Sequence, residues 1–314
     1  MLKSKLNICI LASVTFIIPK VFPFSGNLPI KEPGVVEIPT YTHLTKKIDP
    51  DCERAVQSME KSIKAGLAFD ITTGEIFWEH NSKKECEIAS LTKIMVELLA
   101  MEKLEAKAVT LDDMVPVTQE ASCIRGTRVC LKKGEMFPLE SLLRAALVFS
   151  ANDASHLAGY YIGGCSQEKF IKMMNKRSRE LGMSHTKYWN MTGLPPKKHK
   201  YEANISNCMD LATVSLQLLK YPCIREWMCT KSFSFRKDAK MKRSTNTLMR
   251  NCDLVDGMKT GFYPNAGWNI VATSLCGERK IMVIILGAKS RKTRDDIARK
   301  IIQYEKPSNL MAGK

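Results

Sequence analysis

The segment that decides the fold runs from residue 256 to residue 286 and reads DGMKTGFYPNAGWNIVATSLCGERKIMVIIL. Within it, residues 267–275 and 280–286 alternate or run apolar on either side of a short polar turn, which predicts a β-hairpin. The triplet KTG at 259–261 stands just before this hairpin. It is expected on a strand, where Gly261 would give a ligand access to the backbone. This part of the chain is therefore expected to build a sheet.

A second hairpin pattern lies near the start of the globular region. Residues 65–70 and 76–78 are typical of two strands joined by a turn at 72–74. Helical patterns follow at 91–103, 139–148, 154–161 and, after the last strands, 291–304. Strands at both ends with helices between them predict an α+β fold. We expect an antiparallel sheet built from both chain ends, flanked by helices, with an inserted helical lobe.

The first residues have the pattern of an export signal. Lys3 and Lys5 precede an apolar run at 6–18, which is shorter than the roughly 20 residues of a membrane-spanning helix. No clear cleavage motif follows, so the pattern leaves open whether the segment is removed or kept as an anchor. We expect four parts, which are a signal peptide or N-terminal anchor at 1–25, a tether at 26–50, a folded domain at 51–305 and a polar tail at 306–314.

The composition is that of a globular protein, with 45% hydrophobic and 25% charged residues among 314. These values exclude a disordered chain and one that crosses the membrane many times. The formal net charge of +16 is compatible with an anionic partner, such as nucleic acid, an acidic lipid surface or an acidic polymer, and equally with a charge that only serves solubility. Export argues against nucleic acid, and no segment interleaves aromatic with basic residues as a nucleic-acid surface does. We predict no nucleic-acid partner.

Eleven cysteines are present, and all except Cys9 lie outside the predicted signal. Ten cysteines in an exported protein are compatible with one or two disulfides, and equally with buried free thiols. Their pairing cannot be deduced from sequence. No two C-x2-C pairs occur and the chain has five histidines, so we predict no metal site.

The first chemical motif is ASLTK at 89–93, in which Ser90 stands three residues before Lys93 at the start of a predicted helix. Residues three apart share a helix face, so the lysine amine can reach the serine hydroxyl. A serine becomes a nucleophile when a neighbouring base takes its proton. Lysine can be that base when burial and a nearby positive charge keep its amine neutral.

Two further motifs follow in the chain. The sequence FSAND at 149–153 presents the Ser150 hydroxyl and the Asn152 amide two residues apart in a predicted turn. Lys259 and Thr260 then place a cation and a hydroxyl on a strand. The order S-x-x-K, S-x-N, K-T-G is the motif set of penicillin-binding proteins and class A β-lactamases.

From about residue 60 to 305 the chain resembles the low-molecular-mass penicillin-binding proteins, and specifically the serine-type D-alanyl-D-alanine carboxypeptidases of peptidase family S11. The resemblance is carried by ASLTK at 89–93, by LRAALVFSANDA at 143–154, by DGMKTGFYPNAGWNIVAT at 256–273 and by Asn190, Gly193 and Leu194. It implies a β-lactamase/transpeptidase-like fold and a penicillin-binding serine carboxypeptidase domain.

The resemblance also implies a role for each matching residue. Ser90 would attack the carbonyl between two D-alanines with Lys93 as general base, and Ser150 would relay the proton to the leaving D-alanine. Asn152, Lys259, Thr260, Gly261 and Phe262 would bind the substrate. Lys259 would also assist Ser150, Thr260 would bind the terminal carboxylate, and the backbone N–H groups of Ser90 and Phe262 would form the oxyanion hole. No cofactor is implied.

The implied substrate is the peptidoglycan stem pentapeptide or its precursor, and β-lactam antibiotics would be covalent inhibitors. The implied location is the periplasm or cell envelope. The N-terminal segment, if it is retained, would attach the chain to the inner membrane. Basic residues at 291–300 would either add peripheral membrane contact or form the solvated face of a packed helix. Phe262 departs from the family, because many relatives have a polar residue there.

Two alternative functions stay open. A β-lactamase would need a carboxylate to activate water, and the setting of Glu202 does not resemble that enzyme's loop. The other is a non-enzymatic envelope-binding protein.

Overall fold

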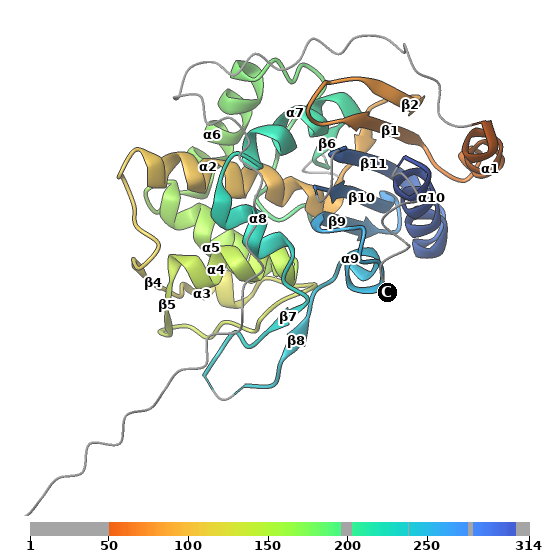
Figure 1. Ribbon diagram of the computed structural model, residues 1–314. Helices are drawn as coiled ribbons and strands as arrows, with labels where there is room; N and C mark the ends of the chain where they lie inside the picture. Colours follow the sequence, from red (N-terminus) through yellow and green to blue (C-terminus); the bar gives the residue numbers. More distant parts are fainter. Residues whose placement is uncertain (1–49, 196–202, 238, 276–278, 306–314) are drawn as a thin grey trace, which may run out of the picture. The chain divides into compact units, whose positions relative to one another are not determined.

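An antiparallel sheet in the order β2-β1-β11-β10-β9 forms the centre of the fold (Figure 1). A computed structural model describes residues 50–195, 203–237, 239–275 and 279–305. By its internal contacts the chain divides into residues 1–36 and 37–314, and all described residues belong to the second unit. The predicted signal at 1–25, the tether at 26–50 except Pro50, and the tail at 306–314 lie outside the described residues.

The five strands of the sheet come from both ends of the described chain, as the sequence predicts. They are β1 (Ala65–Asp70), β2 (Ile76–His80), β9 (Gly257–Tyr263), β10 (Gly267–Ser274) and β11 (Ile281–Ala288). The register pairs Ala65 of β1 with Leu286 of β11, and Val271 of β10 with Lys259 of β9. The outer edge of β9 is therefore a border of the sheet, and it carries the KTG triplet.

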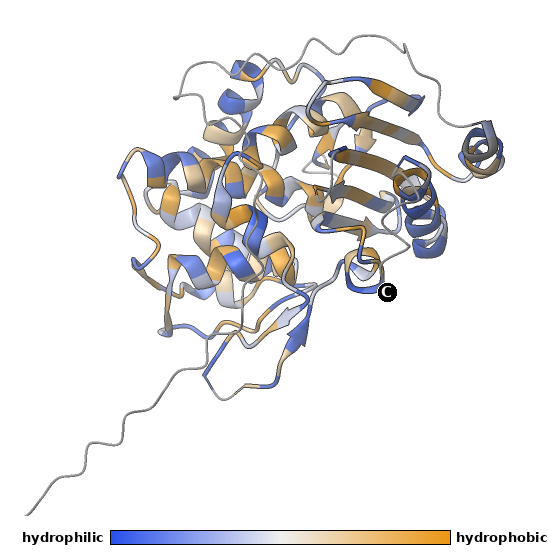
Figure 2. Cartoon of the chain, viewed as in Figure 1, coloured by the Kyte–Doolittle hydropathy of each residue, from blue (hydrophilic) through white to orange (hydrophobic). Residues whose placement is uncertain are grey.

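The sheet separates two apolar clusters because successive side chains on a strand point to opposite faces. On β11, Met282 and Ile284 belong to the cluster on the lobe side, whereas Val283 and Ile285 belong to the cluster on the other side. Figure 2 shows the hydrophobic colour along these central strands, while much of α10 (Arg291–Tyr304) is hydrophilic. The continuous apolar run in the sequence thus reflects burial on both faces.

The face away from the lobe is covered by α10, which packs on β11 and against α1 (Pro50–Glu60) (Figure 1). The short helix α9 (Thr247–Asn251) also contacts α10. The predicted range for α10, 291–304, is confirmed. Its Ile297 and Ile301 are fully buried at helical spacing, which explains why a largely polar helix docks on the sheet.

The inserted lobe is helical, as predicted. Its elements are η1 (Ala89–Thr92), α2 (Lys93–Glu105), α3 (Gln119–Ser122), α4 (Leu139–Val148), α5 (Asn152–Ile162), α6 (Gln167–Glu180), α7 (Cys208–Leu218) and α8 (Pro222–Met228). Three pairs of short strands connect them: β3 (Cys86–Glu87) with β6 (Ile205–Ser206), β4 (Met114–Pro116) with β5 (Met136–Pro138), and β7 (Ser232–Phe233) with β8 (Lys242–Arg243). The buried helix α2 contacts α4, α5, α6 and α7, so the other helices surround it.

Candidate active site

The predicted nucleophile lies at a junction between sheet and lobe. Ser90 sits in the one-turn helix η1, which leads directly into α2 and packs on β9. The structure places Lys93 Nζ 3.0 Å from Ser90 Oγ. Ser90 is partly exposed, whereas Lys93 is fully buried. A proton can therefore pass from a hydroxyl that a substrate can reach to an amine that water cannot reach.

The amine of Lys93 is held by two further oxygens that are both neutral. It donates to Asn152 Oδ1 at 2.8 Å and to the Thr192 carbonyl at 2.5 Å. A neutral amine has two N–H donors and one lone pair. With both donors directed at these oxygens, the lone pair is left for the hydroxyl of Ser90. Burial lowers the pKa of Lys93 well below its ordinary value, and the positive charge of Lys259 lowers it further.

The second motif begins where α4 ends. Ser150 has a φ of 59°, in the left-handed region that non-glycine residues rarely occupy. This conformation turns the chain sharply between α4 and α5. The hydroxyl of Ser150 accepts a hydrogen bond of 2.8 Å from Lys259 Nζ, which also donates to the Thr260 carbonyl at 3.0 Å. Burial lowers the pKa of Lys259 to about 7.

Asn152 connects the two motifs to a loop that precedes α4. Besides accepting from Lys93, its side chain donates to the Arg125 carbonyl at 2.9 Å, and its backbone N–H donates to the Thr127 carbonyl at 2.7 Å. The next residue, Asp153, accepts from the backbone N–H groups of residues 129 and 131, at 3.1 Å each. The S-x-N segment therefore fixes both the base and the loop beside it.

The third motif approaches the nucleophile through Gly261. A Cβ at this position would lie 2.7 Å from the Ile88 carbonyl oxygen and 3.0 Å from the Ser90 nitrogen, so glycine lets β9 pack against η1. Besides the ligand access expected from the sequence, close packing thus requires glycine at this position. Thr260 Oγ1 donates to Thr245 Oγ1 at 3.4 Å. Phe262 is 47% exposed, and its ring stacks on Trp268 with centroids 3.8 Å apart.

The structure thus brings Ser90, Lys93 and Asn152 into one hydrogen-bonded group, and Ser150 and Lys259 into a second. Together these five residues form the candidate cluster, with Thr260 and Gly261 on the adjoining strand. The side chain of Phe262 pairs across the strand with Trp268, on the face opposite the residue pair Lys259 and Val271.

Sequence reasoning missed the groups that position the base. Thr192 supplies a carbonyl, and its neighbour Gly193 has a φ of 76° and lies so close to η1 that a Cβ would come 2.0 Å from the Ala89 oxygen. Their side chains carry no chemical signal, because the functional group is the backbone. Glu97 was also missed, although an acidic residue inside the apolar run at 94–101 is a detectable anomaly.

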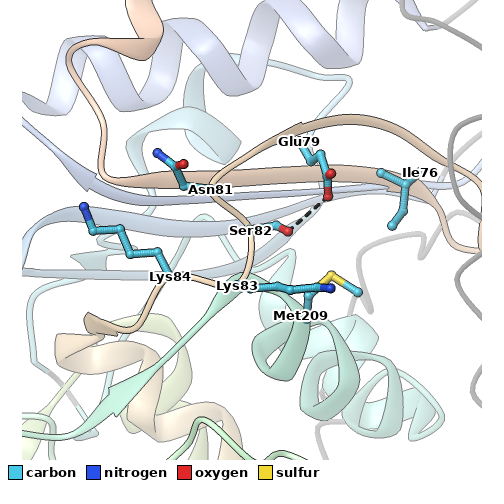
Figure 3. A pocket seen from close by; sticks show the side chains of 7 residues that line it. All are labelled: Ile76, Glu79, Asn81, Ser82, Lys83, Lys84 and Met209. Carbon is cyan, nitrogen blue, oxygen red and sulfur yellow. Dashed lines mark hydrogen bonds between the residues drawn. The ribbon is translucent and has the colours of Figure 1, made fainter.

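A hollow on the surface has no part in this cluster. It is lined by Ile76, Glu79, Asn81, Ser82, Lys83, Lys84 and Met209 (Figure 3). In it the Ser82 hydroxyl donates to the Glu79 carboxylate at 3.1 Å. A serine bound to an acceptor-only carboxylate has no base arranged like Lys93, and none of the predicted site residues lines this hollow.

Other sequence predictions concern metals, thiols and membranes. Within the described residues no group of three or more His, Cys, Asp and Glu side chains is placed to hold a metal ion. Over the same ranges, no helix has the length and apolar character needed to cross a bilayer. Free thiols occur at Cys86, Cys123, Cys130, Cys165, Cys208, Cys223 and Cys252. Glu202, weighed as a β-lactamase carboxylate, lies outside the described residues.

Comparison with known proteins agrees with the motifs. The sequence profile of the peptidase S11 family, described as D-alanyl-D-alanine carboxypeptidase, matches residues 53–290. The D-alanyl-D-alanine carboxypeptidase DacF of Bacillus subtilis is 31% identical over 244 residues, covering 77% of this chain and 61% of the relative. The chain belongs to the peptidase S11 family, and the predicted resemblance is confirmed. It spans about three fifths of the length of that curated relative.

Solved structures agree with the predicted fold class. Penicillin-binding protein 6B from Escherichia coli superposes with a TM-score of 0.71 at 26% identity, covering 85% of this chain and 80% of that one. Penicillin-binding protein D2 from Listeria monocytogenes, in its ampicillin-bound form, has a TM-score of 0.68 at 26% identity, covering 77% of this chain and 96% of that one. The transpeptidase-like α+β fold is therefore confirmed.

Proposed function

We propose that this chain hydrolyses the terminal D-Ala-D-Ala bond of peptidoglycan stem pentapeptides through an acyl-Ser90 intermediate. The observation that carries the proposal is the contact of 3.0 Å between a buried lysine amine and a serine hydroxyl at the border of the sheet. Membership of the S11 family supports the choice of substrate. The reaction takes place in the cell envelope, where the predicted export signal would deliver the protein.

The chemistry follows from the positions of the side chains. Ser90 Oγ forms a bond to the carbonyl carbon between the two D-alanines, and its proton moves to the lone pair of Lys93 Nζ. The C–N bond then breaks, and the proton taken up by Lys93 passes through the Ser150 hydroxyl to the leaving amine of D-alanine, which leaves Lys93 neutral again. The cation of Lys259, 2.8 Å from Ser150 Oγ, favours this transfer. Water finally cleaves the Ser90 ester, with Lys93 again accepting a proton.

The substrate would lie along the free edge of β9. Thr260 would bind the terminal carboxylate, which suits a site that contains the Lys259 cation. Asn152 would bind the amide of the penultimate residue. The backbone N–H groups of Ser90 and Phe262 would form the oxyanion hole, since Gly261 lets their two segments pack closely.

The same residues explain acylation by β-lactams. We propose that a penicillin acylates Ser90 and stays bound for minutes or longer, because its leaving group remains tethered and obstructs water. A β-lactamase needs a carboxylate that activates water at the ester. Among the described residues, Asp153 is buried and its carboxylate accepts backbone N–H groups, an arrangement that holds the loop at 125–131.

Intact-mass measurement after incubation with a penicillin tests the proposal. We expect the wild type to gain one penicillin mass, whereas Ser90→Ala gains none while keeping its circular dichroism spectrum. D-alanine should be released from a muramyl-type pentapeptide by the wild type alone.

Penicillin labelling that persists in Ser90→Ala would reject Ser90 as the nucleophile. Rapid repeated hydrolysis of penicillin without release of D-alanine would favour the β-lactamase alternative. Failure of both reactions in the wild type would favour an envelope-binding protein.

A further inference from the structure

A buried carboxyl group lies directly behind the base. Glu97 follows Lys93 by one turn of α2, so both side chains are on the same face of the helix. Glu97 is 0% exposed, and neither of its oxygens has a hydrogen-bond partner in the described part of the chain. A carboxyl buried in this way destabilises a fold. Stability therefore does not explain why the residue is there.

The charged groups around Glu97 come from two elements. Burial raises the pKa of the Glu97 carboxyl well above its ordinary value, and the described residues whose charges lower it are Lys259 of β9 and Lys93 of α2. Two other charges act on the lysines themselves: Asp153 of α5 on Lys93, and Arg294 of α10 on Lys259. From α8, the half-buried thiol of Cys223 is affected by the charge of Glu97. The helices α4, α6 and α7 also pack on α2, and none of their described residues adds a charge that acts on Glu97.

The proposed reaction requires opposite protonation states of the two lysines. Lys93 must be neutral to accept the proton of Ser90, and Lys259 must be charged to favour transfer through Ser150. In a site shielded from water, an isolated cation is strongly disfavoured. With Glu97 ionised, the state that contains neutral Lys93 and cationic Lys259 has no net charge. Without that carboxylate, the same state contains an uncompensated buried cation.

We propose, on the basis of the proposed function, that Glu97 is a positioning residue for the reaction. Its carboxylate supplies the negative charge that keeps Lys259 protonated while Lys93 is neutral. It acts through the two lysines and does not touch the substrate. The unpartnered oxygens fit this role, because a hydrogen-bonded ion pair would hold one lysine permanently as a cation.

The sign of the effect on the pH profile follows from the charge. The negative charge of Glu97 raises the pKa of both Lys93 and Lys259. Removing this charge lowers both values. The acid limb of the acylation rate, set by deprotonation of Lys93, and the alkaline limb, set by deprotonation of Lys259, consequently both move to lower pH.

The test is the pH dependence of the second-order rate of acylation by a fluorescent penicillin, measured on the full chain with Glu97→Gln. We expect both limbs to move down by about one pH unit, which is about a tenfold loss of rate on the alkaline side. Glu97→Asp, which keeps the charge, should restore at least part of the wild-type profile. The matched control is Glu102→Gln, which removes a carboxylate on the same helix that pairs with Arg177 instead. It should keep the wild-type profile.

Thermal unfolding provides the second measurement. Glu97→Gln and the apolar Glu97→Met should unfold at or above the wild-type temperature, because each removes an unpartnered buried carboxyl. A profile that superimposes on the wild type, or a rate that falls by one factor at every pH, would overturn the proposal. Loss of folding in both variants would also overturn it, because it would show a structural role. A wild type that no penicillin acylates would instead refute the proposed function.

Discussion

Two clusters of buried charged residues lie on opposite faces of the same sheet, and they differ in the hydrogen-bond partners of their charged groups. On the α10 side, Arg294 is 2% exposed and pairs with Asp295 at 2.6 Å, and the Asp295 carboxylate also accepts from the Thr247 hydroxyl at 2.7 Å. On the lobe side, Lys93 and Lys259 are equally buried but donate to neutral oxygens.

The difference separates a structural cluster from a reactive one. A buried charge with an opposite charge in contact keeps its ionisation state, and losing its partner destabilises the fold. A buried amine held only by neutral acceptors loses part of its preference for the charged form. Burial lowers the pKa of Lys259 to about 7. Four substitutions, with expected effects of decreasing size, test this difference between the two clusters.

The largest effect is expected from Lys93→Ala. Removal of the general base should slow acylation by a penicillin by about 10²–10⁴-fold. The variant should keep its near-ultraviolet circular dichroism, because the oxygens that accept from Lys93, Asn152 Oδ1 and the Thr192 carbonyl, are neutral. Acylation rates from intact mass measure the effect. A rate within threefold or so of the wild type would remove Lys93 from the role of base.

The next effect is on stability and comes from Arg294→Met. It leaves Asp295 buried without its cation, which should lower the free energy of unfolding by about 3–5 kcal/mol. Urea denaturation measures the change. Arg291→Met is the matched control, because Arg291 is an exposed residue of the same helix whose guanidinium lies 4.9 Å from the Trp268 ring. It should lose about 1 kcal/mol or less. Equal losses would contradict the assignment of a structural ion pair.

A smaller effect concerns the pH dependence of stability at Lys259. Its pKa is 10.5 in the unfolded chain and about 7 in the folded protein. Between these values the unfolded chain binds the extra proton, so the contribution of Lys259 to the free energy of unfolding rises with pH. Lys259→Met lacks this contribution. Its stability relative to the wild type should therefore be greatest near pH 7 and decline toward pH 10.5. A difference that is constant with pH would show that the folded pKa is not lowered.

The smallest effect is expected from Phe262→Ala. The stacked pair of Phe262 and Trp268 is half exposed, and its loss should lower the free energy of unfolding by about 0.5–1.5 kcal/mol. Acylation should stay within about threefold of the wild type, because the proposed oxyanion donor is the backbone N–H of this residue. A drop of about a hundredfold would assign the side chain to the site after all.

Much of the fold follows from local patterns. The hairpin at 267–286, the helices at 139–148 and 291–304, and the assignment of the sheet to both chain ends are all confirmed. Each depends on alternation, apolar runs or helical spacing within a short window. Helix α2 begins at Lys93, two residues later than predicted, because the nucleophile segment forms the separate turn η1. A sequence pattern does not distinguish a 3₁₀ turn from the first turn of an α-helix.

From the sequence alone we predict which residues carry the chemistry, because the spacing of SxxK, SxN and KTG depends on residue type alone. The sequence does not determine their protonation states or supporting contacts. The Thr192 carbonyl, the close packing at Gly193 and the position of Lys259 near Lys93 depend on segments about 100 or more residues apart in the chain. Burial and the fields of distant charges set a pKa, and both exist only in the folded protein. Tertiary structure therefore decides which of the two buried lysines can be the base.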